Sequence, residues 1–285
     1  MVERITSAQN PKIKELLALQ EKSRLRREKG LFVVEGRREL EHCLAAGFTV
    51  DTVFYCPSIY GDVLTGQGGL GLRAAESLTP SGECCPKSKA TPACERIVEV
   101  TPELYAKIAS RGGTEGIIAE VRVRSLGLDD LQLGPAPLII VLESVEKPGN
   151  LGAVLRSADA AGADAVIVCD PLTDLYNPNL IRSSLGGIFT VPCVATDSAS
   201  AIAWLKQHGI RILTAQLQDS VWYYDSDMRR GTAIVIGTES TGLTQQWRDA
   251  ADEHIRIPML GQLDSLNASV SAAILLFEAV RQRNA

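Results

Sequence analysis

Histidine and aromatic side chains are scarce in this chain of 285 residues, which has three histidines and only 5% aromatic residues. None of the histidines, His42, His208 and His254, lies in a glycine-rich or polar loop that follows a predicted strand. A histidine-based general acid or base is therefore an unattractive starting point. A nucleic-acid surface made of several stacked aromatic rings is also not expected from this composition.

Long apolar runs and paired cysteines are missing as well. No apolar run could span a bilayer, and residues 1–30 lack the central apolar stretch of a signal peptide. The seven cysteines are an odd number and are scattered, so we expect a reduced, cytoplasmic protein with no membrane partner. Cys84, Cys85 and Cys94 have the wrong spacing for a zinc finger or ribbon, so free thiols are favoured and no metal is expected.

Charge is unevenly distributed along the chain. The net charge is −5, but residues 1–38 contain ten basic and five acidic side chains, which leaves −10 for the remainder. A basic end on an acidic body is typical of a local RNA footprint. Salt-bridged side chains on a solvated helix face would give the same composition, and the sequence by itself leaves both interpretations open.

The first half of the chain predicts a small α/β domain over residues 1–125. Helices are predicted at 5–19, 37–46 and 102–109, and strands at 31–34, 50–55, 97–100 and 117–123. Residues 24–29 are predicted to be a charged connector. Residues 66–93 are rich in Gly, Ser, Cys and Pro and predict a flexible insertion, and residues 126–137 predict a linker.

From Leu138 onward, strands and helices alternate. Strands are predicted at 138–143, 164–168, 190–194, 210–215, 232–236 and 254–257, and helices at 150–161, 178–185, 198–208, 243–250 and 266–283. Such alternation predicts an α/β domain over residues 138–285, with a parallel sheet that is covered by helices on both faces. Ligands of these sheets bind where the loops at the carboxyl ends of the strands gather.

Three strand-to-loop transitions stand out in this second half. The strand ending at Glu143 leads into SVEKPGNL, the strand ending at Ile236 leads into GTESTG, and Ile257 leads into PMLGQLDSLN. Asp264 and Ser265 stand before a run with helical spacing and are helix-capping residue types, which places Asn267 in the first turn of the predicted helix. Three polar loops of this kind in one domain favour a ligand site over ornate turns.

The three stretches resemble the three motifs of the SpoU/TrmH family of SPOUT RNA 2′-O-ribose methyltransferases. Motif one is similar to PGNLGAVLRSADAAGA (148–163), motif two to IVIGTESTGLT (234–244), and motif three to IPMLGQLDSLNASVSAAILLFEAVRQR (257–283). Order, spacing and C-terminal position agree over about half of the chain. Each motif alone is weak, whereas the trio is specific. Lys147 departs from the family, in which asparagine or aspartate often precedes the proline.

The resemblance implies more than periodicity shows. It implies a C-terminal parallel-sheet SPOUT domain with a trefoil knot, preceded by a smaller α/β RNA-binding domain that is similar to ribosomal proteins. It also implies S-adenosylmethionine as the cofactor, a homodimer, and structured RNA as the substrate, with ribosomal RNA preferred and transfer RNA as an alternative. Sequence physics alone would not predict a knot.

The resemblance also assigns site residues. The catalytic set is Asn150, Arg156, Glu239, Ser265 and Asn267. The cofactor set is Thr238, Gly237, Gly242, Ile257, Met259, Leu266 and Ser269. Arg156 is expected to act as a base or as a phosphate anchor. Arginine is normally always protonated, so a base role needs help from the substrate phosphate. Structural roles are also open: a surface pair of Arg156 with Asp159, and helix capping for Asn150 and Asn267.

Two other functions compete with methyl transfer. One is an RNA- or ribosome-binding protein that keeps the fold without catalysis, but the complete motif set favours activity. The other is a Rossmann-type oxidoreductase, prompted by GQGGLG at residues 66–71. No convincing strand precedes that glycine pattern, which counts against a dinucleotide loop.

Overall fold

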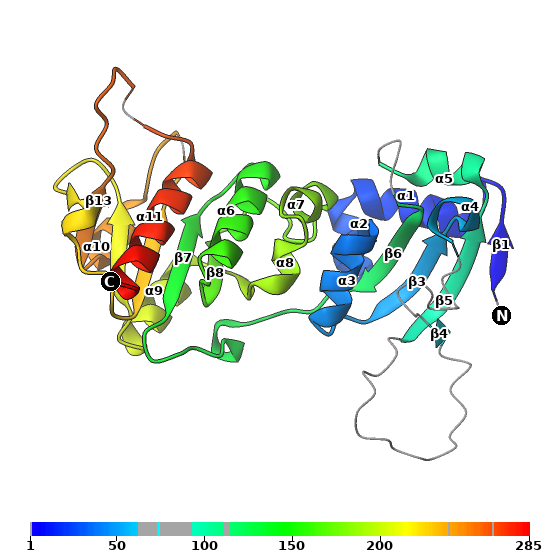
Figure 1. Ribbon diagram of the computed structural model, residues 1–285, viewed down its shortest axis with the longest axis horizontal. Coiled ribbons are helices and arrows are strands. Elements are labelled where there is room, and N and C mark those ends of the chain that lie inside the picture. The colour runs from blue at the N-terminus through cyan, green and yellow to red at the C-terminus, as the bar shows by residue number, and fades with distance from the viewer. Residues whose placement is uncertain (1, 62–72, 75–92, 111–114, 239, 264) are drawn as a thin grey trace, which may run out of the picture. The chain divides into compact units, whose positions relative to one another are not determined.

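The computed structural model describes residues 2–61, 73–74, 93–110, 115–238, 240–263 and 265–285 (Figure 1). The chain forms two compact units, each with its own sheet. Unit 1 comprises the residues up to Arg124 together with Tyr176–Arg182, and unit 2 comprises Ser125–Leu175 and Ser183–Ala285. Among the helices of the described residues, none has the length and apolar character needed to cross a membrane.

Unit 1 contains a mixed sheet in the order β1-β5-β3-β6-β2, with β4 beside β5. Its strands are β1 (Glu3–Ile5), β2 (Leu31–Glu35), β3 (Val50–Tyr55), β4 (Arg73–Ala74), β5 (Ala93–Val100) and β6 (Ile117–Arg122). Its helices are α1 (Pro11–Glu21), α2 (Ser23–Lys29), α3 (Arg37–Ala45), α4 (Pro57–Tyr60) and α5 (Pro102–Ile108). Helices α1 and α5 pack together over a core that includes Leu16, Phe54 and Leu104.

A short segment from the second half of the sequence completes unit 1. The Tyr176 ring stacks on Phe32 with the ring centroids 4.3 Å apart, and its hydroxyl donates to the Arg124 carbonyl oxygen at 2.6 Å. The helix α7 (Pro178–Ser183) follows at once. Nothing in the local sequence indicates this packing, because it depends on contacts between residues far apart in the chain.

Two predictions for the first half need correction. Helix α1 begins at Pro11 rather than near Ile5, because Asn10 caps it by accepting the Lys12 amide proton at 2.9 Å; Ile5 instead ends β1. Residues 23–29 form the helix α2 and not a connector. Within α2, Arg26 is buried and donates to the Leu19 and Gln20 carbonyl oxygens, which anchors α2 to α1. The predicted insertion 66–93 lies outside the described residues except for β4 and the first residue of β5.

Unit 2 contains a fully parallel sheet in the order β11-β13-β10-β12-β7-β8-β9. The strands are β7 (Leu138–Glu143), β8 (Ala165–Cys169), β9 (Cys193–Thr196), β10 (Arg211–Ala215), β11 (Val221–Trp222), β12 (Thr232–Ile236) and β13 (Glu253–Arg256). The α-helices are α6 (Pro148–Ala160), α8 (Gly187–Thr190), α9 (Ser198–Gln207), α10 (Gln245–Ala250) and α11 (Ala268–Arg283). Two 3₁₀ turns, η2 (Leu128–Asp130) and η3 (Tyr223–Asp225), complete the unit.

Helices cover both faces of this sheet, as the alternation of elements predicts. Helices α6 and α11 lie side by side and contact β7, β8 and β12, and α9 and α10 pack together on β8 and β10 (Figure 1). The core under α9 and α10 includes Ile139, Ile167, Leu205 and the fully buried Trp247. The central strands β7, β8 and β12 are buried at every residue and are mostly apolar, because both of their faces are covered.

Most elements of unit 2 agree with the predicted ranges to within a few residues. The predicted strand 190–194 is wrong at its start, because α8 ends at Thr190 and β9 begins only at Cys193. Strand β11 and the turn η3 were not predicted, since two residues are too short to show a periodic pattern. Helix α11 begins after Asn267, so Asn267 caps the helix and does not lie within its first turn.

Candidate functional site

Four strands of unit 2 end side by side at one edge of the sheet. In the order β13-β10-β12-β7 all four are parallel, so their carboxyl ends lie together. The segments that follow β7, β12 and β13 carry the three sequence motifs, and residues 216–220 follow β10. The segment 257–267 connects β13 to α11, which contacts β12 and β7. It therefore has to pass the ends of β10 and β12, where ligands of parallel sheets bind.

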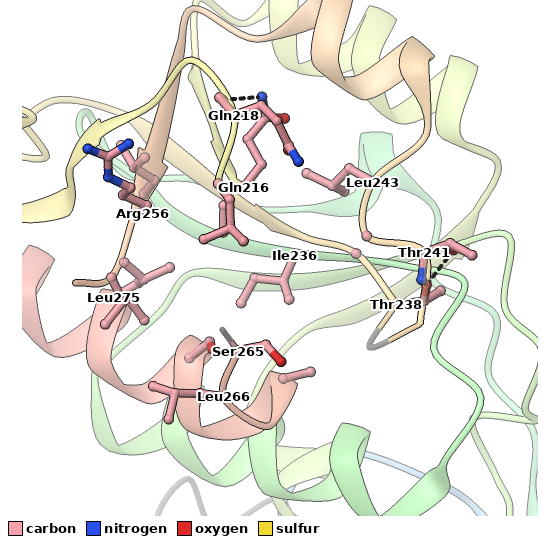
Figure 2. Close-up of a pocket in the computed structure, with 18 of the residues that line it drawn as sticks. Gln216, Gln218, Ile236, Thr238, Thr241, Leu243, Arg256, Ser265, Leu266 and Leu275 are labelled. Atoms are coloured by element: carbon pink, nitrogen blue, oxygen red, sulfur yellow. Dashed lines mark hydrogen bonds between the residues drawn. The ribbon is translucent and has the colours of Figure 1, made fainter. Parts of the chain in front are cut away.

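A cavity of about 420 Å³ opens at this edge (Figure 2). Ser265 and Leu266 lie on one side of it and Gln216 on the opposite side, with Thr238 and Thr241 at one end and Arg256 at the other. Ile236 and Leu275 contribute apolar surface. Its volume falls within the range of about 300–1,000 Å³ that is usual for small-molecule and cofactor sites.

The loop after β12 is a tight hairpin. Thr238 and Gly242 exchange backbone hydrogen bonds of 3.2 and 3.1 Å, and the hydroxyls of Thr238 and Thr241 lie 2.7 Å apart. A Cβ atom on Gly237 would lie 2.3 Å from both the carbonyl carbon and the oxygen of Gly242, so only glycine fits at this position. The hairpin is therefore held in one shape by its own backbone.

Glu143 holds the segment after this hairpin against the end of β7. This buried residue, the last of β7, accepts hydrogen bonds from the backbone amide of Thr244 at 2.9 Å and from its hydroxyl at 2.7 Å. Thr244 is the N-cap residue of α10. This role of Glu143 was not predicted, since an acidic residue at the end of a strand has no specific local signal.

A second, smaller cavity of about 130 Å³ adjoins the first one. The two share Gly237, Thr238, Ser240 and Ala268 in their walls. The second cavity is also lined by residues of the segment after β7, among them Glu146, Lys147 and Asn150. The two adjoining cavities bring the motif-one segment next to the loops of motifs two and three.

A side-chain hydrogen bond links motif one to motif three. The Asn267 amide Nδ2 donates to Asn150 Oδ1 at 3.2 Å. Asn267 Oδ1 in turn accepts from the Ser269 amide at 3.0 Å and from the Ser269 hydroxyl at 2.6 Å. Asn267 therefore caps α11 and contacts the motif-one segment at the same time, so its capping and site roles coexist.

Eight of the twelve proposed site residues line the two cavities, and Asn267, which lines neither, donates to Asn150 of the smaller one. Gly237, Thr238, Gly242, Ile257, Met259, Leu266 and Ser265 line the larger cavity, and Asn150 lines the smaller one. Ser269 lines neither cavity and instead donates to Asn267. Arg156 is exposed on α6 and lines neither cavity. Glu239 lies outside the described residues.

The suggested surface pair of Arg156 with Asp159 is not formed. Asp159 accepts a hydrogen bond from the Thr190 hydroxyl at 2.6 Å. In the described parts of the chain, no carboxylate forms an ion pair with Arg156. The position of this arginine outside the cavities of its own chain is thus not explained by an ion pair with a described residue.

Gln216 and Arg248 are site residues that sequence reasoning missed. Both line the larger cavity, and Gln216 Oε1 and Arg248 Nε are buried atoms that lack a hydrogen-bond partner within the described structure. Gln216 follows the predicted strand 210–215, so the polar run QLQDS was a signal of the same kind as the three motifs. It could not be connected to them before the neighbours of β10 were known. The described residues also contain no cluster of His, Cys, Asp and Glu that could hold a metal ion.

Comparison with known protein families matches both halves of the chain. A model described as the SpoU rRNA Methylase family matches residues 137–277. A model described as an MRM3-like substrate binding domain matches residues 10–119. The two matches lie on either side of the segment 120–136, which contains most of the predicted linker.

Individual relatives match over nearly the whole chain. A 23S rRNA (uridine(2479)-2′-O)-methyltransferase of Streptomyces viridochromogenes is 30% identical, over 98% of this chain and 92% of its own length. Among solved structures, an RNA 2′-O ribose methyltransferase aligns with a TM-score of 0.77 at 37% identity, covering 99% of this chain and 100% of its own. The AdoMet-bound rRNA methyltransferase from Sinorhizobium meliloti aligns with a TM-score of 0.81 at 26% identity, covering 98% of each chain.

Proposed function

The chain belongs to the SpoU rRNA methylase family, and from this membership we propose that it transfers a methyl group from S-adenosylmethionine to a ribose 2′-hydroxyl of 23S ribosomal RNA. The observation that carries the proposal is the pair of adjoining cavities around which the loops of all three motifs meet. The RNA methyltransferase relatives match nearly the whole chain, so the similarity extends over both units.

The larger cavity fits S-adenosylmethionine chemically. It combines apolar surface from Ile236 and Leu275 with two buried polar atoms that lack partners among the described residues, Gln216 Oε1 and Arg248 Nε. We assign cofactor binding to the residues of the motif-two and motif-three loops that line this cavity, namely Gly237, Thr238, Gly242, Ile257, Met259 and Leu266. Ser269 supports them indirectly by fixing Asn267.

The cofactor supplies a methyl group that is already activated on a sulfonium, so the protein has to align the acceptor hydroxyl and remove its proton. We assign alignment of the ribose to Asn150, Asn267 and Ser265, which line or adjoin the two cavities. Glu239 is assigned to the acceptor nucleotide through its place in motif two. Arg156 is assigned to the substrate phosphate or to proton removal.

We further propose that the active protein is a homodimer. Arg156 is exposed on α6 and lines neither cavity of its own chain, so a second subunit is needed to bring such an arginine to a site. On α11, Val270 and Phe277 are each 47% exposed, and Ile274 lies between them on the same helix face. This apolar stripe is a suitable contact for the second copy.

The remaining assignments also follow the family. Residues 1–125 are proposed to bind the RNA, residues 126–137 to link the two parts, and residues 138–285 to form the catalytic domain with its knot. The passage of the segment 257–267 across the ends of β10 and β12 supports a knotted C-terminus. Because the proposed substrate is ribosomal RNA, we expect the protein to act in the cytoplasm.

The proposal is tested by incubating the protein with radiolabelled S-adenosylmethionine and either 23S ribosomal RNA or transfer RNA. We expect label in the ribosomal RNA, in a nucleotide that resists alkaline cleavage because its 2′-hydroxyl is blocked. Label in transfer RNA alone would show that transfer RNA, and not ribosomal RNA, is the substrate. RNA binding without any transfer would support the non-catalytic alternative.

A further inference from the structure

Trp222, Tyr223 and Tyr224 form a run of three aromatic residues at the outer edge of the sheet in unit 2. Strand β11 pairs with β13, which sets Trp222 directly beside Arg256. The guanidinium carbon of Arg256 lies 4.3 Å from the centroid of the Trp222 ring. The Trp222 and Tyr224 rings are 6.4 Å apart, with their planes inclined by only 22°. We call Trp222, Tyr224 and Arg256 the aromatic platform.

The aromatic platform is open to solvent. Trp222 is 37% exposed and Tyr224 46% exposed, and the neighbouring Val221 and Leu217 are 41% and 48% exposed. The chain has only 14 aromatic residues, from which a surface of stacked rings was not expected, yet Trp222 and Tyr224 stack here with their rings exposed. Apolar side chains that gather on a surface mark an interaction site more often than isolated ones do.

The backbone on both sides of the aromatic platform is firmly anchored. Before it, the Ser220 hydroxyl donates to the Leu217 carbonyl oxygen at 2.8 Å. After it, the Met228 amide donates to Gln282 Oε1 at 2.8 Å, and Gln282 Nε2 donates to the Ser226 carbonyl oxygen at 3.0 Å. Met228 itself is fully buried. The rings are therefore displayed on a fixed backbone.

Arg256 connects the aromatic platform to the proposed active site. It lines the larger cavity, at the end opposite Thr238 and Thr241 (Figure 2). Among the residues that the structure describes, no carboxylate neutralises its guanidinium. A cation that is already stacked on an indole thus stands between the cavity and the exposed rings.

We propose that the aromatic platform stacks an unpaired nucleobase of the RNA substrate close to the nucleotide being methylated, an inference that rests on the proposed function. Single-stranded RNA is recognised by stacking of its bases on aromatic rings and arginine planes, and the phosphates beside such a base are attracted to the arginine. A stable interface between protein copies involves roughly 20–30 residues a side. The aromatic platform with Val221 and Leu217 is much smaller than that.

Tryptophan fluorescence reports directly on binding at the aromatic platform. Trp222 is exposed, whereas Trp204 and Trp247 are 6% and 0% exposed, so a quencher in solution reaches mainly Trp222. We expect a short single-stranded oligouridylate to quench the emission of the full-length protein and a fully paired RNA duplex of equal length to quench it far less. In Trp222→Leu the oligonucleotide-dependent quenching should disappear.

Methylation kinetics provide the second readout. Trp222→Leu removes the stacking surface and should raise KM for 23S ribosomal RNA about tenfold, the scale of one lost base–aromatic stack, with the affinity for S-adenosylmethionine unchanged. Trp222→Phe keeps a ring and should recover most of the loss. Leu172→Ala is the matched control, because Leu172 is 65% exposed and follows β8, which lies far from β11 in the strand order of the sheet. It should leave KM unaltered.

Three results separate the inference from the proposed function. Unchanged KM and unchanged quenching in a folded Trp222→Leu variant would overturn the role of the aromatic platform while leaving the methyltransferase intact. Quenching of wild-type protein by oligouridylate without any methyl transfer would support the aromatic platform and overturn the proposed function. A change in sedimentation caused by Trp222→Leu would show that the surface joins two copies of the chain, and would also overturn the inference.

Discussion

At the scale of single residues, Arg156 is a position where a replacement can test activity without changing the stability of the fold. It is exposed, forms no ion pair with a described carboxylate, and lines neither cavity. Its replacement should therefore change stability little, since exposed arginines on helices contribute about 0–1 kcal/mol even when they are paired. Any large loss of activity has to arise from contact with substrate.

We expect Arg156→Ala to lower single-turnover methylation of 23S ribosomal RNA by about 100-fold or more, the scale of a positioned acid–base group. Calorimetric affinity for S-adenosylmethionine should remain at the wild-type value. Arg156→Lys keeps the charge but not the planar guanidinium, and it serves as the control for simple electrostatic attraction. A wild-type rate in Arg156→Ala would remove this residue from the catalytic set.

Glu120 is a second informative residue, in unit 1. It is 5% exposed on β6, and its Oε1 has no hydrogen-bond partner within the described structure. Burial, together with the nearby carboxylates of Glu15 on α1 and Asp51 on β3, raises the pKa of this carboxyl to about 7, against the lowering effects of Arg96 and Thr52. The protonated form is thus favoured in the folded protein.

Because this pKa lies above the ordinary value of 4.5 for a glutamate, ionisation of the carboxyl destabilises the fold as pH rises toward and through about 7. The loss between pH 5 and pH 8 should be on the order of 3 kcal/mol. Glu120→Gln cannot ionise, so it should lose less unfolding free energy than the wild type over that interval. Urea unfolding of both proteins at the two pH values measures the difference. Parallel pH curves for the two proteins would contradict a buried, ionising Glu120.

At the scale of elements, the hairpin after β12 depends on backbone contact. A Cβ atom on Gly237 would meet the Gly242 backbone at 2.3 Å, and backbone atoms cannot yield as a flexible side chain can. Gly237→Ala should therefore lower the affinity for S-adenosylmethionine at least tenfold, which corresponds to about 1.4 kcal/mol. Gly149→Ala in motif one is the matched control, since a Cβ atom there would have nothing within 4 Å of it. Equal calorimetric affinities for the two variants would contradict a fixed hairpin.

The basic side chains of α2 have two different roles, structural and RNA-facing, which composition could not distinguish. Arg26 is buried and holds α1 and α2 together, so it is structural. Arg24 and Lys29 form exposed ion pairs with Glu28 and Glu15, and Arg27 is exposed. These three side chains of α2 are exposed and available to RNA phosphates.

Replacing Arg24, Arg27 and Lys29 by glutamine, with Arg26 left in place, should flatten the dependence of RNA affinity on salt. Each lost phosphate contact reduces the logarithmic slope by roughly 0.7–0.9. Affinities measured over a series of salt concentrations give the slope, with Lys206→Gln on α9 as the control for loss of charge elsewhere. An unaltered slope would mean that α1 and α2 only present a solvated, salt-bridged face.

At the scale of the whole molecule, the proposed homodimer accounts for the position of Arg156 and for the apolar stripe on α11. We expect sedimentation to give a dimer at micromolar concentration. Phe277→Asp should dissociate it, because a charge would be buried in an apolar contact, whereas Phe277→Leu should keep the dimer. A wild-type monomer would require each RNA site to be built from one chain.

The sequence alone determined the alternation of elements and the three motif loops of this protein. Runs such as Leu138–Leu142 and Ala233–Ile236 are apolar because strands of a covered parallel sheet are buried on both faces, and this signal is local. Glycines and polar residues that follow the strands, such as Gly237 and Asn267, could also be identified, because their positions in the motifs are a local signal.

Only the tertiary structure decided which of these segments meet. Strand order depends on pairing between distant segments, so the position of β10 between β12 and β13, and with it the role of Gln216, could not be read locally. The same holds for Trp222 beside Arg256, and for Tyr176 in unit 1. The starts of two helices also depended on it: Asn10 caps α1 and Asn267 caps α11, because capping depends on where the preceding backbone turns.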